Sequence, residues 1–423
     1  MNLRKTFPGI HKRQLVHPGC VFVLLLTLAL SLALMAITRS QPFILGDQWG
    51  DHIFYWGQAD TWLRLSSPMA LSTETQQNLE AFRISYYYDA DNGLSLQPPY
   101  VYRVFVPLLA GSLGHLVGLG TSFSVVHFVS LTVFLLAVGL SIHQLTRSTL
   151  WSSLGMFLSL AAIPMLTNLI RFPGLVEIPS LALTALAVYF TTRGTYAVAL
   201  GVAVLASLTK ETLTLLGLSI AIYAILREHK VRYWLVLVGL LPIALQLGMR
   251  ILVTVPSPPS TAELFVPGNP FEAIFTFVAA FGLVSPLIVG LLTRYARLWI
   301  LAFTPLFLSI AVVTTSVVAG GARIWLTVWP LIVIIGLAGL WHWARTIVVR
   351  AALVILLLTG TLLAQGEVLL GWPRILQTAW FLGFIVWLAL LSAIRTWNST
   401  SLEIGSPAGR YVDRNTPTWT ESP

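Results

Sequence analysis

Charged side chains are scarce in this sequence. Asp, Glu, Lys and Arg together account for 10% of its 423 residues, whereas apolar residues account for 56%. Soluble globular domains carry about 25% charged residues, and the mean hydropathy of this chain is +0.81. This composition excludes a soluble domain and predicts an integral membrane protein.

Cysteine and the common catalytic motifs are also missing. The single cysteine, Cys20, excludes a disulfide framework or a thiolate metal cluster. No GxGxxG, P-loop, HExxH or GxSxG pattern occurs in the chain, so these nucleotide-binding and hydrolytic motifs are excluded. His115, His127 and His143 belong to different segments, and we therefore expect no histidine metal site.

Basic residues outnumber acidic ones, and the formal net charge is +9. The Lys and Arg residues stand singly between apolar runs instead of forming a cluster. Membrane proteins collect basic residues in their cytoplasmic loops. The excess of basic residues therefore reflects the orientation of the chain in the membrane, and no nucleic-acid partner is expected.

Long apolar runs make up most of the chain. The basic segment 1–18 precedes the run Cys20–Ile37, which has no small-residue cleavage site and is predicted to remain as a signal anchor. Further runs lie at about 122–145, 150–168, 174–192, 195–208, 210–226, 233–254, 271–293, 297–319, 324–342, 349–366 and 372–395. They predict an all-α bundle of about twelve spans over residues 19–395. The runs 195–208 and 210–226 are short against the ~17–25 residues of a full crossing.

The segment 101–118 decides the orientation of every later span. It is apolar but contains Arg103, a proline and a histidine. If it does not cross, 16 of the 25 Lys and Arg residues lie on the side of the basic N-terminus, as positive-inside topology requires. We therefore expect an amphipathic or re-entrant helix here, within an extracytoplasmic loop of residues 40–121. Both termini then lie in the cytoplasm, and we expect the polar tail 396–423 to be disordered. The expected location is the plasma membrane of a bacterium.

Acidic residues concentrate on the predicted outer face. Twelve of the 16 Asp and Glu residues lie there, seven of them between Asp47 and Asp91. Later outer turns contribute Arg171, Glu177, Lys210, Glu211 and Arg323. Ionisable residues at membrane depth cost about 2.5–3.5 kcal/mol each. We therefore expect these side chains to face one another or a water-filled cavity.

Short motifs on this outer face resemble those of the GT-C class of polytopic glycosyltransferases. Asp51–Tyr55 (DHIFY) is similar to the D-x-x-x-Y pattern of their first outer loop, and Tyr102–Pro107 (YRVFVP) to their Y-R-x-x-x-P interfacial helix. Leu208–Glu211 (LTKE) resembles their L-T-[KR]-E turn, and Arg323–Pro330 (RIWLTVWP) their late R-x-L-x-x-x-x-P element. The resemblance in topology covers roughly residues 20–395.

The resemblance implies transfer of a sugar from a polyprenyl-phosphate donor to a glycan, lipid or protein acceptor on the outer side of the membrane. Asp51 is then the candidate general base, and Asp47 is a second carboxylate that binds the acceptor or an optional Mg²⁺ or Mn²⁺ ion. Which of the two is the base stays open, because the family signature is an adjacent acidic pair or a D-x-D, whereas these residues are four apart. No fixed metal site is expected.

The remaining predicted site residues bind the donor or line its pocket. Arg103, Lys210 and Arg323 are the candidate phosphate-binding residues, since arginine forms bidentate contacts with phosphate and lysine acts as a point charge. The pocket candidates are Tyr55, Tyr102, Arg171, Glu177 and Glu211. Tyr55 and its neighbour Trp56 are expected to stack on sugar rings.

Each of these residues also has an interpretation without catalytic function. Asp47 and Asp51 are favoured residues for capping a helix. Arg103 can extend from an interfacial helix to the lipid headgroups, and the aromatic residues can form an interfacial belt. Lys210 and Glu211 can form ion pairs with neighbouring loops.

A transporter or flippase is the second functional class that fits the layout. Twelve spans with both termini in the cytoplasm are common among transporters, and short interrupted helices can mark a substrate site. The two halves of the chain show no internal similarity, however, and the acidic outer loop 40–121 has no counterpart in the second half. The favoured prediction is an enzyme, with transport of a lipid-linked sugar or a small solute as the alternative.

Overall fold

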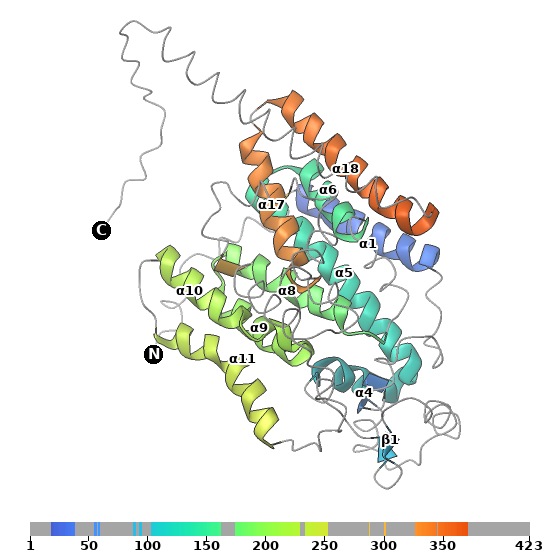
Figure 1. Cartoon of the computed structure of the whole chain (residues 1–423), viewed down its shortest axis with the longest axis vertical. Helices are drawn as coiled ribbons and strands as arrows, with labels where there is room; N and C mark the ends of the chain where they lie inside the picture. The colour runs from blue at the N-terminus through green and yellow to red at the C-terminus, as the bar shows by residue number, and fades with distance from the viewer. Residues whose placement is uncertain are drawn as a thin grey trace, which may run out of the picture.

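The computed structural model describes the chain in several separate stretches. These are residues 18–38, 55–56, 58–59, 88–89, 93–94, 103–161, 174–228, 233–252, 287, 300–301, 326–344 and 346–370. They contain ten α-helices, two 3₁₀ turns and one pair of two-residue strands (Figure 1). The predicted all-α class is confirmed for this part of the chain.

The helices follow the predicted apolar runs. They are α1 (Pro18–Thr38), α4 (Phe105–Val117), α5 (Leu119–Thr146), α6 (Thr149–Ala161), α8 (Glu177–Thr192), α9 (Tyr196–Thr209), α10 (Leu216–Glu228), α11 (Tyr233–Leu252), α17 (Trp329–Trp343) and α18 (Ile347–Leu370). The 3₁₀ turns are η4 (Glu211–Leu213) and η7 (Leu326–Val328). The strands β1 (Tyr88–Asp89) and β2 (Gly93–Leu94) pair antiparallel.

Three stretches are long and apolar enough to cross a membrane. They are Leu119–Thr146, Tyr233–Leu252 and Leu326–Trp343, as judged by length and composition. This finding fits a multi-pass membrane protein. The total of twelve spans stays a prediction, because the run 372–395 and nearly all of 271–293 and 297–319 lie outside the described residues.

Helix α5 is the centre of the described bundle. It packs against α1, α4, α6, α8 and α17, and the largest core cluster includes Leu131, Phe134, Leu135 and Ile142 from its buried positions. Trp329 at the start of α17 donates a hydrogen bond from its indole nitrogen to the Ser159 carbonyl of α6, at 3.1 Å. This bond ties a buried polar group of one helix to another, and such a partner offsets the cost of placing the group in an apolar surrounding.

Contacts between helix termini occur at two ends of the described bundle. At one end, Arg227 of α10 donates to the Thr192 carbonyl of α8 at 3.2 Å, and a ring nitrogen of His342 in α17 lies 3.2 Å from the Leu145 carbonyl of α5. The start of α8 and the end of α9 meet at the other end, beside α4 (Figure 1). We call this second end the α4 end.

Helix α4 matches the predicted interfacial segment. Its 13 residues give a length of about 20 Å, which is short of the ~30 Å hydrocarbon core. Gly118, at φ 79° and ψ 154°, separates α4 from α5 with a backbone conformation that residues with a Cβ rarely adopt. Figure 1 shows α4 lying across the end of α5, on the same side of the molecule as β1. Its orientation relative to a membrane stays a prediction.

Helix α11 contacts the bundle through a narrow stripe. Its buried residues are Leu235, Gly239, Pro242 and Gln246, a spacing of four, three and four that lies along one helix face. Glycines permit close approach to α10: a Cβ at Gly239 would lie 3.0 Å from the Gly217 carbonyl oxygen and 2.9 Å from the Ala221 Cβ. The two helices are therefore in near-backbone contact.

Replacing Gly239 with valine should separate α10 from α11. The added side chain cannot fit beside the Gly217 carbonyl, and overpacking of this kind costs about 1–3 kcal/mol. Thermal unfolding of the purified protein in detergent should show a clearly lower Tm for Gly239→Val. The matched control is Gly248→Val on the same helix, because a Cβ at Gly248 meets nothing within 4 Å. Equal loss of Tm in both variants would contradict the close contact.

Candidate functional site

The candidate site is built around an interruption between two helices. Helix α9 ends at Thr209, and Lys210 adopts an extended backbone conformation, with φ −153° and ψ 125°, before the turn η4 begins at Glu211. Successive side chains of extended backbone point to opposite sides. Lys210 and Glu211 therefore reach different partners, although they are neighbours in the sequence.

Glu211 forms a bidentate ion pair with Arg103. The Arg103 Nε donates to Glu211 Oε2 at 2.7 Å, and its Nη2 donates to Glu211 Oε1 at 2.5 Å. The two side chains are only 11% and 20% exposed. Arg103 precedes α4 by two residues, so this pair joins α4 to the turn after α9.

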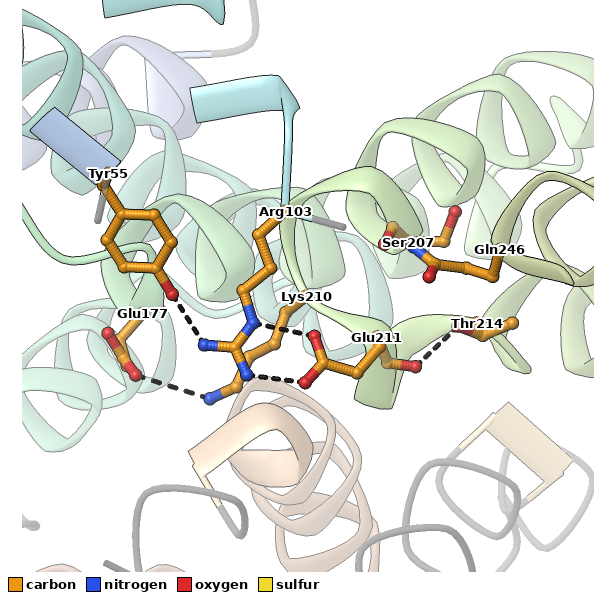
Figure 2. A network of polar contacts seen from close by, with 8 residues as sticks. All are labelled: Tyr55, Arg103, Glu177, Ser207, Lys210, Glu211, Thr214 and Gln246. Atoms are coloured by element: carbon orange, nitrogen blue, oxygen red, sulfur yellow. Dashed lines mark hydrogen bonds and ion pairs between the residues drawn. The ribbon is translucent and has the colours of Figure 1, made fainter. Parts of the chain in front are cut away.

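Tyr55 holds the other side of the same guanidinium group. The Nη1 of Arg103 donates to the Tyr55 hydroxyl oxygen at 2.6 Å. Figure 2 shows Arg103 between Tyr55 and Glu211. Three of the five guanidinium N–H groups are thereby directed to two partners from distant parts of the sequence, which sets the plane of the guanidinium group.

Lys210 pairs with a carboxylate on α8. Its Nζ lies 3.6 Å from Glu177 Oε1, and the two side chains are 4% and 2% exposed. Glu177 is the first residue of α8, where a carboxylate also interacts favourably with the helix dipole. Charges this deeply buried must be paired to be tolerated.

A small apolar cluster supports the pair from the side of Tyr55. The buried members of this cluster are Tyr55, Ala59, Val106, Ala110, Phe123, Val126 and Val176. Trp56 stacks on Phe123, with ring centroids 5.9 Å apart and an interplanar angle of 12°. The cluster thus fastens Tyr55, Trp56 and Ala59 to α4, α5 and the start of α8.

The rings of Tyr55 and Trp56 pack against other residues of the protein in this arrangement. The Tyr55 side chain is fully buried, and Trp56 stacks on Phe123. A buried ring offers no face to a sugar, so the predicted stacking role of Tyr55 is replaced by a role in holding Arg103.

The ion pair between Arg103 and Glu211 shifts the pKa values of both groups, which lie outside the α-helices. Burial raises the pKa of the Glu211 carboxyl, but the Arg103 guanidinium and its hydrogen bonds lower the pKa by more, so that it lies below its ordinary value. Burial lowers the pKa of Arg103, and the Glu211 carboxylate and the Tyr55 hydroxyl more than reverse that effect. Both groups are therefore charged at neutral pH.

The charges of the two described ion pairs at the α4 end balance. Arg103 and Lys210 are cations, and each lies against a carboxylate, Glu211 and Glu177 respectively. Within the described residues, no group of three or more His, Cys, Asp or Glu side chains is placed to hold a metal ion. Glu177 and Glu211 are each paired with a cation. The chemistry that suits this arrangement is binding of an anion by exchange with a carboxylate.

Five of the ten predicted site residues meet in this cluster. Tyr55, Arg103, Glu177, Lys210 and Glu211 are brought together from four separate segments. The other five, Asp47, Asp51, Tyr102, Arg171 and Arg323, lie outside the described residues. The structure thus pairs Arg103 with Glu211 and Lys210 with Glu177, and the roles of these residues in a site stay predictions.

Sequence reasoning missed one polar residue beside the cluster. Gln246 of α11 donates from its side-chain nitrogen to the Ser207 carbonyl of α9 at 2.7 Å, and it is 4% exposed. The available signal was an uncharged polar side chain within the apolar run 233–254. Polar residues at membrane depth mark functional or packing contacts.

Replacing Glu211 with glutamine should remove an acid-sensitive part of the stability. Because the folded-state pKa of Glu211 lies below its ordinary value, the pair stabilises the fold above about pH 4.5 and loses this effect as the pH falls through the folded-state pKa. At pH 7, Glu211→Gln should cost about 3 kcal/mol, since it leaves Arg103 without its carboxylate.

The measurement is Tm in detergent at pH 7 and at pH 3. Wild type should lose more Tm between these values than Glu211→Gln does. Glu228→Gln is the matched control, because it removes a carboxylate at the end of α10, away from the α4 end. A variant at Glu211 that loses as much Tm as wild type on acidification would show that this carboxylate carries no acid-sensitive stability.

Comparison with known proteins adds no relative from which a function could be transferred. No family model, curated protein or solved structure matches this chain. The function has to be inferred from the chain's own residues and from the geometry of the α4 end.

Proposed function

We propose that this protein is a membrane glycosyltransferase of the GT-C type, which moves a sugar from a polyprenyl-phosphate donor to an acceptor at the extracytoplasmic face. The observation that carries the proposal is the meeting of Arg103 and Lys210 with Glu177, Glu211 and Tyr55 at the α4 end. Arg103 of the motif YRVFVP and Glu211 of the motif LTKE thus contact each other although 108 residues separate them.

The cations suit the phosphate group of a lipid-linked donor. Arginine matches two phosphate oxygens with two parallel N–H groups, and lysine adds a compact positive charge. Both side chains are largely buried, where charge interactions are stronger than in water. A phosphate that gains negative charge as its bond to the sugar breaks is stabilised most by cations already held in place.

Binding of the donor requires an exchange of partners. Arg103 is engaged by Glu211 on two of its N–H groups, so a phosphate replaces this carboxylate or shares the guanidinium with it. Tyr55 holds the Nη1 side and keeps the group oriented during the exchange. The chain thereby keeps two buried cations neutralised while the donor is absent, which avoids the cost of unpaired charge.

The transfer step itself is assigned to the first outer loop. Asp51, or Asp47, takes the proton from the acceptor hydroxyl as its oxygen attacks the anomeric carbon. The bond between that carbon and the phosphate oxygen breaks, and its electron pair stays with the polyprenyl phosphate. Tyr102, Arg171 and Arg323 are proposed to complete the pocket around the donor. No step in this scheme needs a metal ion.

Loss of either cation should weaken binding of a lipid phosphate. We expect Arg103→Met and Lys210→Met each to raise the Kd for farnesyl monophosphate at least about tenfold, as one lost charge-assisted hydrogen bond is worth about 1.5–3 kcal/mol. Arg103→Lys keeps the charge without the bidentate geometry and should fall between wild type and Arg103→Met. Isothermal titration calorimetry in detergent measures these constants.

Two controls accompany this titration. Arg193→Met removes an exposed arginine at the opposite end of α8 from Glu177 and should leave the Kd unchanged. Farnesol, which has the same chain without phosphate, should bind equally to all variants. If Arg103→Met and Lys210→Met bind farnesyl monophosphate as wild type does, these residues do not form a phosphate site.

Asp51→Asn should abolish sugar transfer in the purified protein. The amide is nearly the same size as the carboxylate but cannot accept the proton, so transfer from a lipid-linked donor should fall by about 10²–10⁴-fold. Donor binding and Tm should stay as in wild type, and Asp47→Asn tests the second carboxylate in the same assay. An active Asp51→Asn enzyme would remove Asp51 from the mechanism. Solute flux in proteoliposomes without any lipid-linked sugar would favour a transporter.

A further inference from the structure

Gln246 is a buried polar side chain on an otherwise apolar helix. Helix α11 is exposed along most of its surface, and Gln246 is the last of the four residues in its buried stripe. Its side chain is not directed to α11 itself. Instead, its Nε2 donates to the Ser207 carbonyl oxygen of α9 at 2.7 Å. A 4% exposed amide is costly among apolar groups unless it makes such a bond.

Ser207 lies in the last turn of α9. The final carbonyl groups of an α-helix lack the amide four residues further on, and they need partners from elsewhere. The amide of Lys210 still donates to Ala206 at 2.9 Å, but the backbone then becomes extended at Lys210. Gln246 supplies a side-chain donor at the point where the helix stops.

The position of this hydrogen bond relative to the ion pairs is visible in Figure 2. Gln246 and Ser207 lie on one side of Glu211, and Arg103 and Tyr55 lie on the other. Helix α11 packs against α10 where Gly239 meets Gly217. Gly239 lies seven residues before Gln246. Because residues seven apart lie on one face, the same contact that fastens α11 to α10 aims Gln246 at the end of α9.

The end of α9 determines where the charged side chains point. In a continuous helix, the side chains of Lys210 and Glu211 would project from the same helix axis, about 100° apart. The extended conformation at Lys210 instead sends Lys210 towards Glu177 and Glu211 towards Arg103. Any group that stabilises the end of α9 at Thr209 also stabilises the orientations of the Lys210 and Glu211 side chains.

We propose that Gln246 is a positioning residue, which caps the Ser207 carbonyl and so holds the break after α9 that directs Lys210 and Glu211 into the site. Its effect on the donor rests on the function proposed above, whereas its effect on the backbone does not. Gln246 touches neither reacting atoms nor phosphate in this scheme. It acts through residues 207–214, which comprise the end of α9 and the turn that follows it.

The first test is hydrogen–deuterium exchange of the full-length protein in detergent. Gln246→Leu keeps the approximate size of the side chain and removes its donor, so amides in residues 207–214 should exchange about fivefold faster, as expected for one lost hydrogen bond. Gln246→Asn keeps the amide but is one methylene shorter, and it should show the same change. Gln144→Leu, a matched change in α5, should leave this segment as in wild type. Unchanged exchange in both Gln246 variants would overturn the proposal.

The second test measures farnesyl monophosphate binding in a double-mutant cycle. Gln246→Leu should raise the Kd about tenfold with wild-type Lys210 and by clearly less in the Lys210→Met background, because part of its effect passes through Lys210. A merely structural role would lower Tm and weaken binding equally in both backgrounds, and that result would overturn the proposal. If wild type binds farnesyl monophosphate no better than farnesol, the proposed function fails, while the exchange experiment still decides the role of Gln246.

Discussion

The interruption of the helical path at Lys210 is the constraint on which the rest of the α4 end depends. One extended residue between α9 and η4 turns two sequence neighbours towards different partners. Lys210 reaches α8, and Glu211 reaches the segment before α4. The turn thereby connects three parts of the bundle through charged side chains.

Neutralisation explains why this arrangement is tolerated inside an apolar protein. Two cations and two carboxylates are largely withdrawn from water, and each would carry a large desolvation cost alone. Replacing such pairs with apolar residues is often neutral or stabilising, so stability alone is a weak reason for keeping them. The proposed exchange of a carboxylate for a phosphate gives a functional reason, because in that scheme the cations are paired both before and after the donor binds.

Much of the fold follows from patterns that are local in the sequence. The apolar runs predict the helices, the resemblance to an interfacial element predicts α4, and the LTKE segment predicts a turn between two short helices; the structure contains all three. The convergence of Arg103, Lys210, Glu177 and Glu211 was also predictable, because charges at membrane depth need partners. The identity of the pairs was not, since either carboxylate could have served either cation. The hydrogen bond from Arg103 to the Tyr55 hydroxyl was not predictable either. The Tyr55 ring is buried by Phe123, Val126 and Val176, which are distant in the sequence.

The sequence by itself determined the class of this protein, its helices and the need for its buried charges to meet, because composition and hydrophobic periodicity are properties of neighbouring residues. Only the tertiary structure decided which charges pair and which polar groups support them. Gln246 lies 39 residues from Ser207, and Tyr55 lies 48 residues from Arg103. Contacts at such separations depend on how whole helices pack, as where the glycines of α10 and α11 let two backbones touch, and packing of this kind has no local signature in the chain.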